Sequence, residues 1–279
     1  MIKGLKKINL EMKIGFFVLS GYLLWASFWQ VYSRFVAGSY SKPFVPGFNL
    51  RKELVSISFD SVWGTDIYGR SLFQVISEGL VYSLSTAMMV SFIAAAVGII
   101  FGFLAISENP KVKLFFDFLI NSIFIFPSIL IAILIMSIVG QSYWGLIFAL
   151  SVTNWPGYAK IARGECLRIT KMEYVEGAKA VGVGPIRLFL TVIIPNLLPV
   201  VLVHFVLGVS GVIISEASLG FLGLGVSEYS WGALFSMSKT VLLEAPRLTI
   251  ILSLCVGGLI IGLNLFGDGL RDYLDPKEK

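Results

Sequence analysis

The residues of this chain that could perform chemistry are few and widely separated. His204 is the single histidine and lies in an apolar run, and Cys166 and Cys255 are far apart, with no CxxC pair. Neither a zinc site nor a disulfide framework is therefore indicated. A phosphate-binding loop needs Gly-Lys before Ser or Thr, and no Gly-Lys dipeptide occurs in the sequence. We expect no catalytic residue, no metal site and no cofactor bound by this chain.

The most informative polar stretch spans residues 172–185. Four apolar residues recur at three- and four-residue spacing on one face of a helix predicted from Met172 to Val181, namely Tyr174, Val175, Ala178 and Val181. Glu173 and Glu176 lie in its first turns, where the helix dipole favours negative charge. Gly182 is a helix stop, which we predict to occupy the C′ position with a positive φ, and Pro185 suits the first turn of the next helix. This pattern alone fits a helix that docks on a partner and a helix that lies in the lipid interface equally well.

The spacing in this stretch resembles the signature of the permease subunits of binding-protein-dependent ATP-binding-cassette (ABC) importers. In that family Glu-Ala-Ala is followed after three residues by Gly, and after nine more by Ile-x-Leu-Pro. Here the same spacing joins Glu176-Gly-Ala178 to Gly182 and to Val192-x-Ile-Pro195, with substitutions that keep the size class. The resemblance implies that the 172–185 helix is a coupling helix that docks into a cleft on an ATPase subunit. Its implied coupling residues are Glu173, Tyr174, Glu176, Gly177, Ala178, Gly182 and Pro195.

Other stretches are similar to one branch of this family, the C-type permeases for dipeptides, oligopeptides and nickel. They are residues 63–70 (Trp-Gly-Thr-Asp-Ile-Tyr-Gly-Arg), 155–163, 216–226, 230–232 and 268–272, all in the family's order. The resemblance covers roughly residues 60–276. It implies an external entry motif made by Gly64, Thr65, Asp66, Gly69 and Arg70.

Some of these residues have a plainer structural interpretation. Asp66 and Arg70 are four residues apart near a predicted helix start, so they could simply cap it and pair with each other. The glycines of residues 221–225 could serve tight packing or a re-entrant turn. An ionisable residue in a span is a functional hypothesis by default, but Glu216 would be ordinary at the outer interface. As a sharper alternative, we predict that the translocation path includes Glu216, Phe221, Leu222 and Gly223.

The elements that must position these residues are membrane-spanning helices. Of 279 residues, 56% are hydrophobic and only 14% are charged, with a mean hydropathy of +0.85, whereas soluble domains carry about 25% charged residues. Segments long enough to span a bilayer lie near 14–31, 81–106, 114–139, 143–159, 190–215 and 248–267. We expect the fourth to end where Pro156 and Gly157 kink or break it. The predicted fold is all-α with about six transmembrane helices, and the resemblance implies a type I ABC importer permease.

We divide the chain into a stub with the first helix (1–33), an external segment (34–79) and a permease core (80–279). The first helix is interpreted as uncleaved and not as a signal peptide. Basic residues precede it, so both termini and residues 160–189 are expected in the cytoplasm, with 216–247 outside. The net charge of +5 is then mostly a topology signal, and no nucleic-acid partner is needed.

The resemblance implies a permease subunit of the bacterial cytoplasmic membrane that imports short peptides, or nickel or another small solute as the alternative. Its implied partners are the lipid bilayer, a homologous second permease, an extracytoplasmic substrate-binding protein and two cytosolic ATPase subunits that bind ATP and Mg. A secondary transporter should show inverted repeats with charged broken helices, and an intramembrane enzyme needs paired catalytic residues. We find neither pattern in the sequence.

Overall fold

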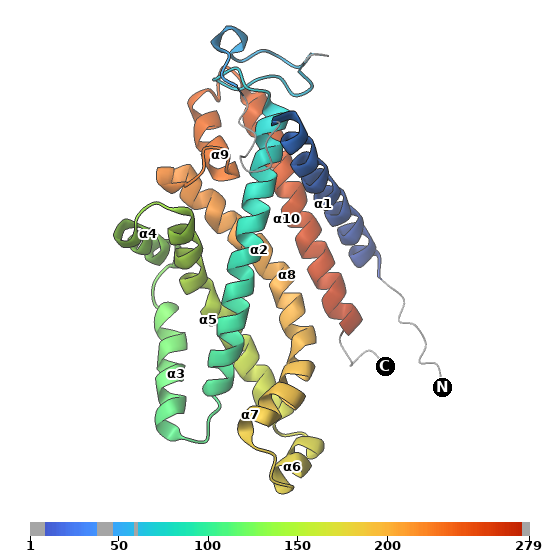
Figure 1. The fold of residues 1–279 in the computed structure, drawn as a ribbon, viewed down its shortest axis with the longest axis vertical. Helices are drawn as coiled ribbons and strands as arrows, with labels where there is room; N and C mark the ends of the chain where they lie inside the picture. Colours follow the sequence, from blue (N-terminus) through green and yellow to red (C-terminus); the bar gives the residue numbers. More distant parts are fainter. Residues whose placement is uncertain (1–8, 38–46, 59–60, 275–279) are drawn as a thin grey trace.

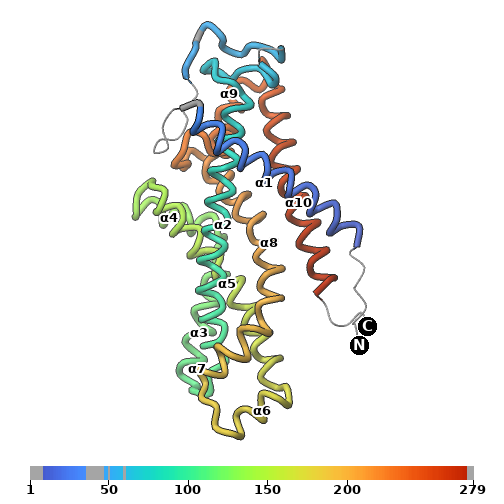
Figure 2. The backbone as a smooth tube through the Cα atoms, turned by 45° about the vertical axis from the view of Figure 1, so that its right-hand side comes forward, coloured from blue at the N-terminus to red at the C-terminus, as the bar shows by residue number. Residues whose placement is uncertain are grey.

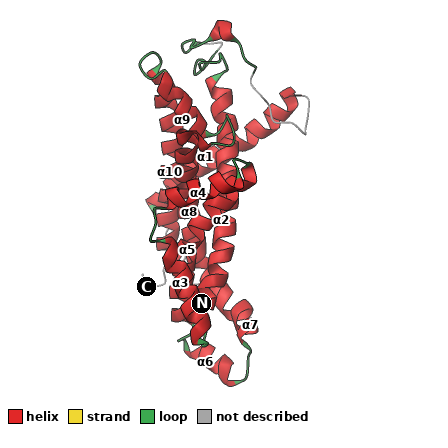
Figure 3. Ribbon diagram, turned by 90° about the vertical axis from the view of Figure 1, so that its left-hand side faces the viewer, coloured by secondary structure: helices red, strands yellow, loops and turns green. Residues whose placement is uncertain are grey.

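The computed structural model describes residues 9–37, 47–58 and 61–274, and it is helical, with no β-strand in these ranges (Figures 1 and 3). Its α-helices are α1 (Leu10–Ala37), α2 (Leu72–Leu104), α3 (Pro110–Ile123), α4 (Ser128–Val139), α5 (Tyr143–Ile169), α6 (Glu173–Ala180), α7 (Pro185–Leu188), α8 (Ile194–Leu219), α9 (Trp231–Thr240) and α10 (Pro246–Leu274). A 3-10 turn, η1 (Leu50–Lys52), and two π-helical turns, η2 (Phe189–Ile193) and η3 (Gly220–Leu224), complete the elements. The predicted positions of the two termini fall on residues 1–8 and 275–279, outside the described ranges.

Among the described residues, four helical stretches are long and apolar enough to cross a membrane. They are residues 10–35 in α1, all of α2, residues 185–224 from α7 through η3, and all of α10. Three of them run roughly along the long axis of the molecule, whereas α1 lies oblique to it (Figures 1 and 2). Residues 47–58 and 61–71 lie at one end of the molecule and α6 lies at the other. This arrangement agrees with the predicted first, second, fifth and sixth spans.

The predicted third span, 114–139, is wrong as a single helix. Here α3 ends at Ile123, α4 begins at Ser128, and the two helices meet at an angle of 94°. Pro127 has no N–H to donate to the preceding turn, and its ring disfavours the helical conformation of Phe126. The apolar composition of the stretch conceals this break, because hydropathy does not register backbone geometry.

The predicted end of the fourth span at Pro156 is also wrong, because α5 continues to Ile169 with Pro156 inside it. A proline in a helix interior costs about 3 kcal/mol. The helix is held along this length by α2, whose Gly98 and Gly102 approach it closely. A Cβ at Gly98 would lie 2.5 Å from the Tyr158 Cβ, and one at Gly102 would lie 2.6 Å from the Ala159 carbonyl oxygen. The first ten residues of the predicted 160–189 connection therefore belong to α5.

In the part of the chain that the structure describes, the buried apolar side chains form two clusters, stacked along the bundle. The first joins the beginnings of α2 and α5 to the end of α8, α9 and α10. The second joins the ends of α2 and α5 to α3, α6, α7 and the beginning of α8. As a result, α6 shares its core with the lower half of α5, while η3 and α9 belong to the opposite half.

Helix α1 lies along α10 with very little space between the two backbones. A Cβ at Gly15 would lie 2.3 Å from the Phe266 backbone nitrogen, and the Tyr22 hydroxyl donates a 2.7 Å hydrogen bond to the Cys255 carbonyl oxygen. The opposite face of α1 exposes large apolar side chains such as Phe17. An exposed apolar face of this kind suits lipid and not water.

Candidate coupling helix and translocation path

Helix α6 lies at one end of the molecule, three residues after α5 ends (Figures 1 and 2). Val175 is fully buried, and Ala178 packs against the same cluster as the end of α5. Tyr174 and Val181, predicted on that same apolar face, are instead 50% and 83% exposed. The four residues predicted to form one apolar face of α6 are therefore partly buried and partly exposed. Two residues anchor α6 to the core, and two apolar residues remain available outside it.

The end of α6 is fixed by its backbone. Gly182 has φ +84°, donates to the Lys179 carbonyl oxygen at 2.9 Å, and is followed by Val183, which donates to the Ala178 carbonyl oxygen at 3.1 Å. This pair of bonds is the Schellman arrangement, with Gly182 at the C′ position. The predicted positive φ of Gly182 is confirmed, and it determines the direction in which the chain leaves α6.

Besides these two apolar residues, the outward side of α6 carries charged side chains and one glycine. Glu173, Glu176 and Lys179 are exposed, and a Cβ at Gly177 would meet no atom within 4 Å. Six of the seven predicted coupling residues lie in α6 or at its end. Pro195 lies apart from them, exposed in the first turn of α8 beyond η2.

At the opposite end, Asp66 and Arg70 form a fully buried ion pair. Arg70 Nε lies 2.7 Å from Asp66 Oδ2, while Asp66 Oδ1 accepts hydrogen bonds from the backbone N–H groups of Tyr68 and Arg70 at 2.9 Å each. The interpretation that these two residues pair with each other is confirmed. A role of this motif in substrate entry stays a prediction.

Arg70 also joins residues 61–71 to the loop before α9. Its Nη1 lies 3.4 Å from Glu228 Oε2, and its guanidinium lies 4.7 Å from the Tyr68 ring centroid and 5.5 Å from that of Tyr229. Burial raises the pKa of the Tyr229 hydroxyl, and the adjacent Glu228 carboxylate raises it further. The phenol therefore stays neutral, and its ring remains a suitable partner for the cation.

Three other residues of the motif hold the loop together. Gly64 and Gly69 have φ values of +77° and +69°, and a Cβ at Gly69 would lie 1.9 Å from the Asn49 carbonyl oxygen. Thr65 Oγ1 accepts a 2.8 Å hydrogen bond from the Val55 N–H. Each of these three residues therefore has a role in the local fold of the loop, which accounts for its residue type.

Glu216 and the residues after it occupy different environments. Glu216 is 1% exposed and accepts a 2.9 Å hydrogen bond from the Ser83 hydroxyl of α2, so its carboxylate lies between α2 and α8. Gly223 has φ +82° and interrupts the helix that would otherwise continue from α8. The predicted path residues are therefore not a single surface.

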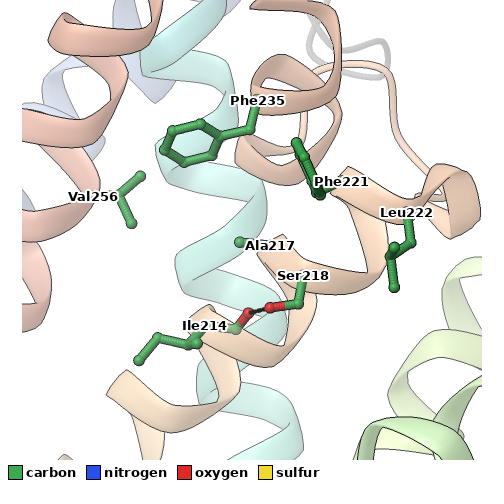
Figure 4. A pocket seen from close by; sticks show the side chains of 7 residues that line it. All are labelled: Ile214, Ala217, Ser218, Phe221, Leu222, Phe235 and Val256. Atoms are coloured by element: carbon green, nitrogen blue, oxygen red, sulfur yellow. Dashed lines mark hydrogen bonds between the residues drawn. The ribbon is translucent and has the colours of Figure 1, made fainter. Parts of the chain in front are cut away.

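Phe221 and Leu222 do share a surface, an apolar hollow of about 400 Å³ (Figure 4). Its other lining residues are Ile214, Ala217, Ser218, Phe235 and Val256. They come from α8, α9 and α10, so residues distant in sequence form its walls. The structure thus brings two of the four predicted path residues to one concave site.

An ion pair in the other half of the molecule was not predicted from the sequence. Asp117 of α3, which has no evident partner in the sequence, pairs with Arg163 of α5 through contacts of 2.8 and 3.0 Å. One turn earlier, Lys160 Nζ lies 5.5 Å from the Phe124 ring centroid. These contacts depend on the continuation of α5 past Pro156. The sequence analysis could not predict them, because it placed the end of this helix near Pro156.

Comparison with known proteins identifies a family and relatives that match most of this chain. The family described as "Binding-protein-dependent transport system inner membrane component" matches residues 94–279. The dipeptide transport system permease protein DppC of Alkalihalophilus pseudofirmus is 32% identical over 283 residues, which cover 99% of this chain and 89% of that protein. The glutathione transport system permease protein GsiD of Escherichia coli is 31% identical over 223 residues, which cover 78% of this chain and 72% of that protein.

Solved structures share the fold at low sequence identity. The methionine ABC transporter MetNI in an inward-facing conformation aligns with a TM-score of 0.61 and 18% identity, covering 72% of this chain and 97% of that one. An amino acid ABC transporter aligns with a TM-score of 0.54 and 16% identity, covering 71% and 92%. The fold is therefore that of a type I ABC importer permease. The chain belongs to the family of binding-protein-dependent transport system inner membrane components, and it is a multi-pass permease subunit of an ABC importer, with a transport role and not a catalytic one.

Proposed function

We propose that this permease imports short peptides across the bacterial cytoplasmic membrane. Two relatives with more than 30% identity are named for a dipeptide and for glutathione, which are both short peptides. The C-type motifs of the external segment and of residues 216–226 support the same branch of the family. Nickel or another small solute is the alternative substrate.

The rigid mounting of α6 is the observation that carries the mechanism. Val175 is buried in the same cluster as Cys166 and Ile169 of α5, and only three residues connect the two helices. A force applied to α6 therefore passes into α5 with little loss, because packed interiors deform very little. We propose that two cytosolic ATPase subunits, which bind ATP and Mg, move α6 as they close.

The surface of α6 suits a protein cleft. Tyr174 and Val181 supply exposed apolar area, and Glu173 and Glu176 supply charge for a basic partner group. Gly177 lets a partner approach the backbone. A homologous second permease would complete the translocation path, and an extracytoplasmic binding protein would deliver the peptide to the end formed by residues 47–71. In this orientation α6 and both chain termini are cytoplasmic.

Uptake of a labelled dipeptide by cells that express the chain with its partner subunits tests the proposal. We expect Glu176→Lys to leave the protein in the membrane but to reduce uptake and co-purification of the ATPase subunits more than tenfold. Glu108→Lys is a matched control, because Glu108 is also exposed, in the connection between α2 and α3. If α6 instead lay in the lipid interface, an added lysine would suit it and uptake would stay near normal.

The same cells distinguish the substrates. Uptake of nickel without uptake of any dipeptide would reject the peptide proposal while leaving the coupling role of α6 in place. Normal uptake and normal co-purification for Glu176→Lys would reject the coupling role instead.

A further inference from the structure

The hollow beside η3 has the size and lining of a small-molecule site. Its volume of about 400 Å³ falls within the range of roughly 300–1,000 Å³ that is usual for such sites. Phe221 and Phe235 stand at its upper edge and α8 contributes its lower wall (Figure 4). The one polar lining side chain is Ser218, whose hydroxyl already donates to the Ile214 carbonyl oxygen at 2.7 Å. The hollow itself therefore offers an apolar environment and no charge.

A cation contacts Phe221, one of the residues that line this hollow. Lys239, in the last turn of α9, holds its Nζ 5.2 Å from the centroid of the Phe221 ring. Its side chain is exposed, and no carboxylate in the described part of the chain lies within 4.0 Å of it. The contact with Phe221 is a cation–π interaction that holds the ammonium beside the hollow while leaving N–H donors available.

The acidic residue of α8, Glu216, does not compete for this cation. Its carboxylate is buried on the far side of α8, where it accepts the hydrogen bond from Ser83. The hollow and Lys239 thus present an apolar surface next to one unpaired positive charge. A ligand that fits both parts has an apolar group and a carboxylate close to each other.

We propose that this site, comprising the hollow and Lys239, binds the C-terminal residue of a peptide in transit. The apolar side chain of that residue enters the hollow, and its α-carboxylate accepts charge-assisted hydrogen bonds from Lys239. The inference rests on the proposed peptide import. It specifies which end of the peptide the permease recognises. It also predicts a preference for an apolar C-terminal residue with a free carboxylate.

Uptake of labelled Ala-Phe and of its C-terminal amide, by cells expressing the whole transporter, tests the role of the charge. We expect the wild type to import Ala-Phe about tenfold faster than the amide at low concentration, as the loss of a charged hydrogen bond predicts. Lys239→Gln should remove this discrimination, and Lys239→Arg should keep most of it. Lys160→Gln is the matched control, because Lys160 also contacts an aromatic ring but lies in the other half of the molecule.

A second variant tests the hollow. Ser218→Phe adds a large side chain to its wall, and we expect uptake of Ala-Phe to fall at least tenfold more than uptake of Ala-Gly. A lipid chain or a side chain of the second permease in the hollow would give a different result. Both peptides would then be affected equally, or the second permease would be lost on purification, and either result would overturn the proposal.

Different results would overturn the proposed function and the binding of the peptide C-terminus. A wild-type transporter that imports neither Ala-Phe nor its amide would overturn the proposed function, and this inference with it. A wild type that imports Ala-Phe, with the same preference for the free carboxylate in Lys239→Gln, would overturn only the inference.

Discussion

Replacing Gly182 by alanine should weaken the coupling of the permease to the ATPase subunits, and backbone strain should be the only cause. Gly182 has φ +84°, and a Cβ there would meet no atom within 4 Å, so a steric clash with neighbouring residues adds nothing. The remaining cost is that of the left-handed conformation, roughly 1–2 kcal/mol for a residue with a Cβ. Helix α6 has only eight residues, so a cost of this size at its end competes directly with its last hydrogen bonds.

We expect Gly182→Ala to reduce uptake and co-purification of the ATPase subunits about 5- to 30-fold, which corresponds to 1–2 kcal/mol. Gly182→Leu should reduce them more than tenfold, because it adds bulk at the docking surface. Gly182→Asn should lose less than alanine, since asparagine tolerates positive φ better. The assay compares uptake of a labelled dipeptide, the amount of permease in the membrane and the ATPase subunits retained on purification.

Gly184→Ala is the matched control for this series. Gly184 also lies in open space, but its φ is −65°, which alanine adopts without strain. If Gly182→Ala and Gly184→Ala gave the same uptake, the positive φ would not matter for coupling. The assignment of the Schellman end as the element that aims α6 would then be refuted.

Four other predictions concern the rest of the chain. Asp66→Ala leaves the buried Arg70 cation without its buried partner, and we expect a loss of about 3–5 kcal/mol in the stability of residues 61–71, measured by limited proteolysis, whereas Glu228→Ala should cost at most about 1 kcal/mol. A double-mutant cycle on thermal unfolding with Asp117→Ala and Arg163→Ala should give a coupling energy of about 1 kcal/mol, and strictly additive effects would contradict the ion pair. Single cysteines at positions 179 and 239, in a chain without Cys166 and Cys255, should be labelled from the cytoplasmic and the external side respectively, and external labelling at 179 would reverse the topology. The purified permease alone should neither bind nor hydrolyse ATP, and activity that persists after removal of partner subunits would disprove this.

Hydropathy and local backbone chemistry in the sequence determined much of this protein. Long apolar segments predicted the four stretches of the described residues that are long enough to span a bilayer, since lipid requires each spanning segment to satisfy its own backbone. The glycine at position 182, after a short amphipathic stretch, predicted both the end of α6 and its positive φ. These features depend on residues within a few positions of one another, so the sequence is sufficient for them.

Proline was a less reliable predictor of helix ends, because its effect on a helix depends on the packing around it. Pro127 separates α3 from α4, whereas Pro156 is accommodated inside α5. The difference lies in packing, since α2 presents Gly98 and Gly102 against α5 near Pro156. No pattern local to Pro156 records that contact.

The environments of the charged groups were decided by the tertiary structure alone. Asp117 meets Arg163 only because α5 continues past Pro156, and Glu216 faces Ser83 of α2 and not the hollow that Phe221 lines. Lys239 approaches Phe221 because η3 turns the chain back toward α9. Each of these pairs joins separate elements, and in a bilayer the partner of a charge sets its energetic cost. Hydropathy places a residue along a span, but only the packing of the helices determines which side chain it meets.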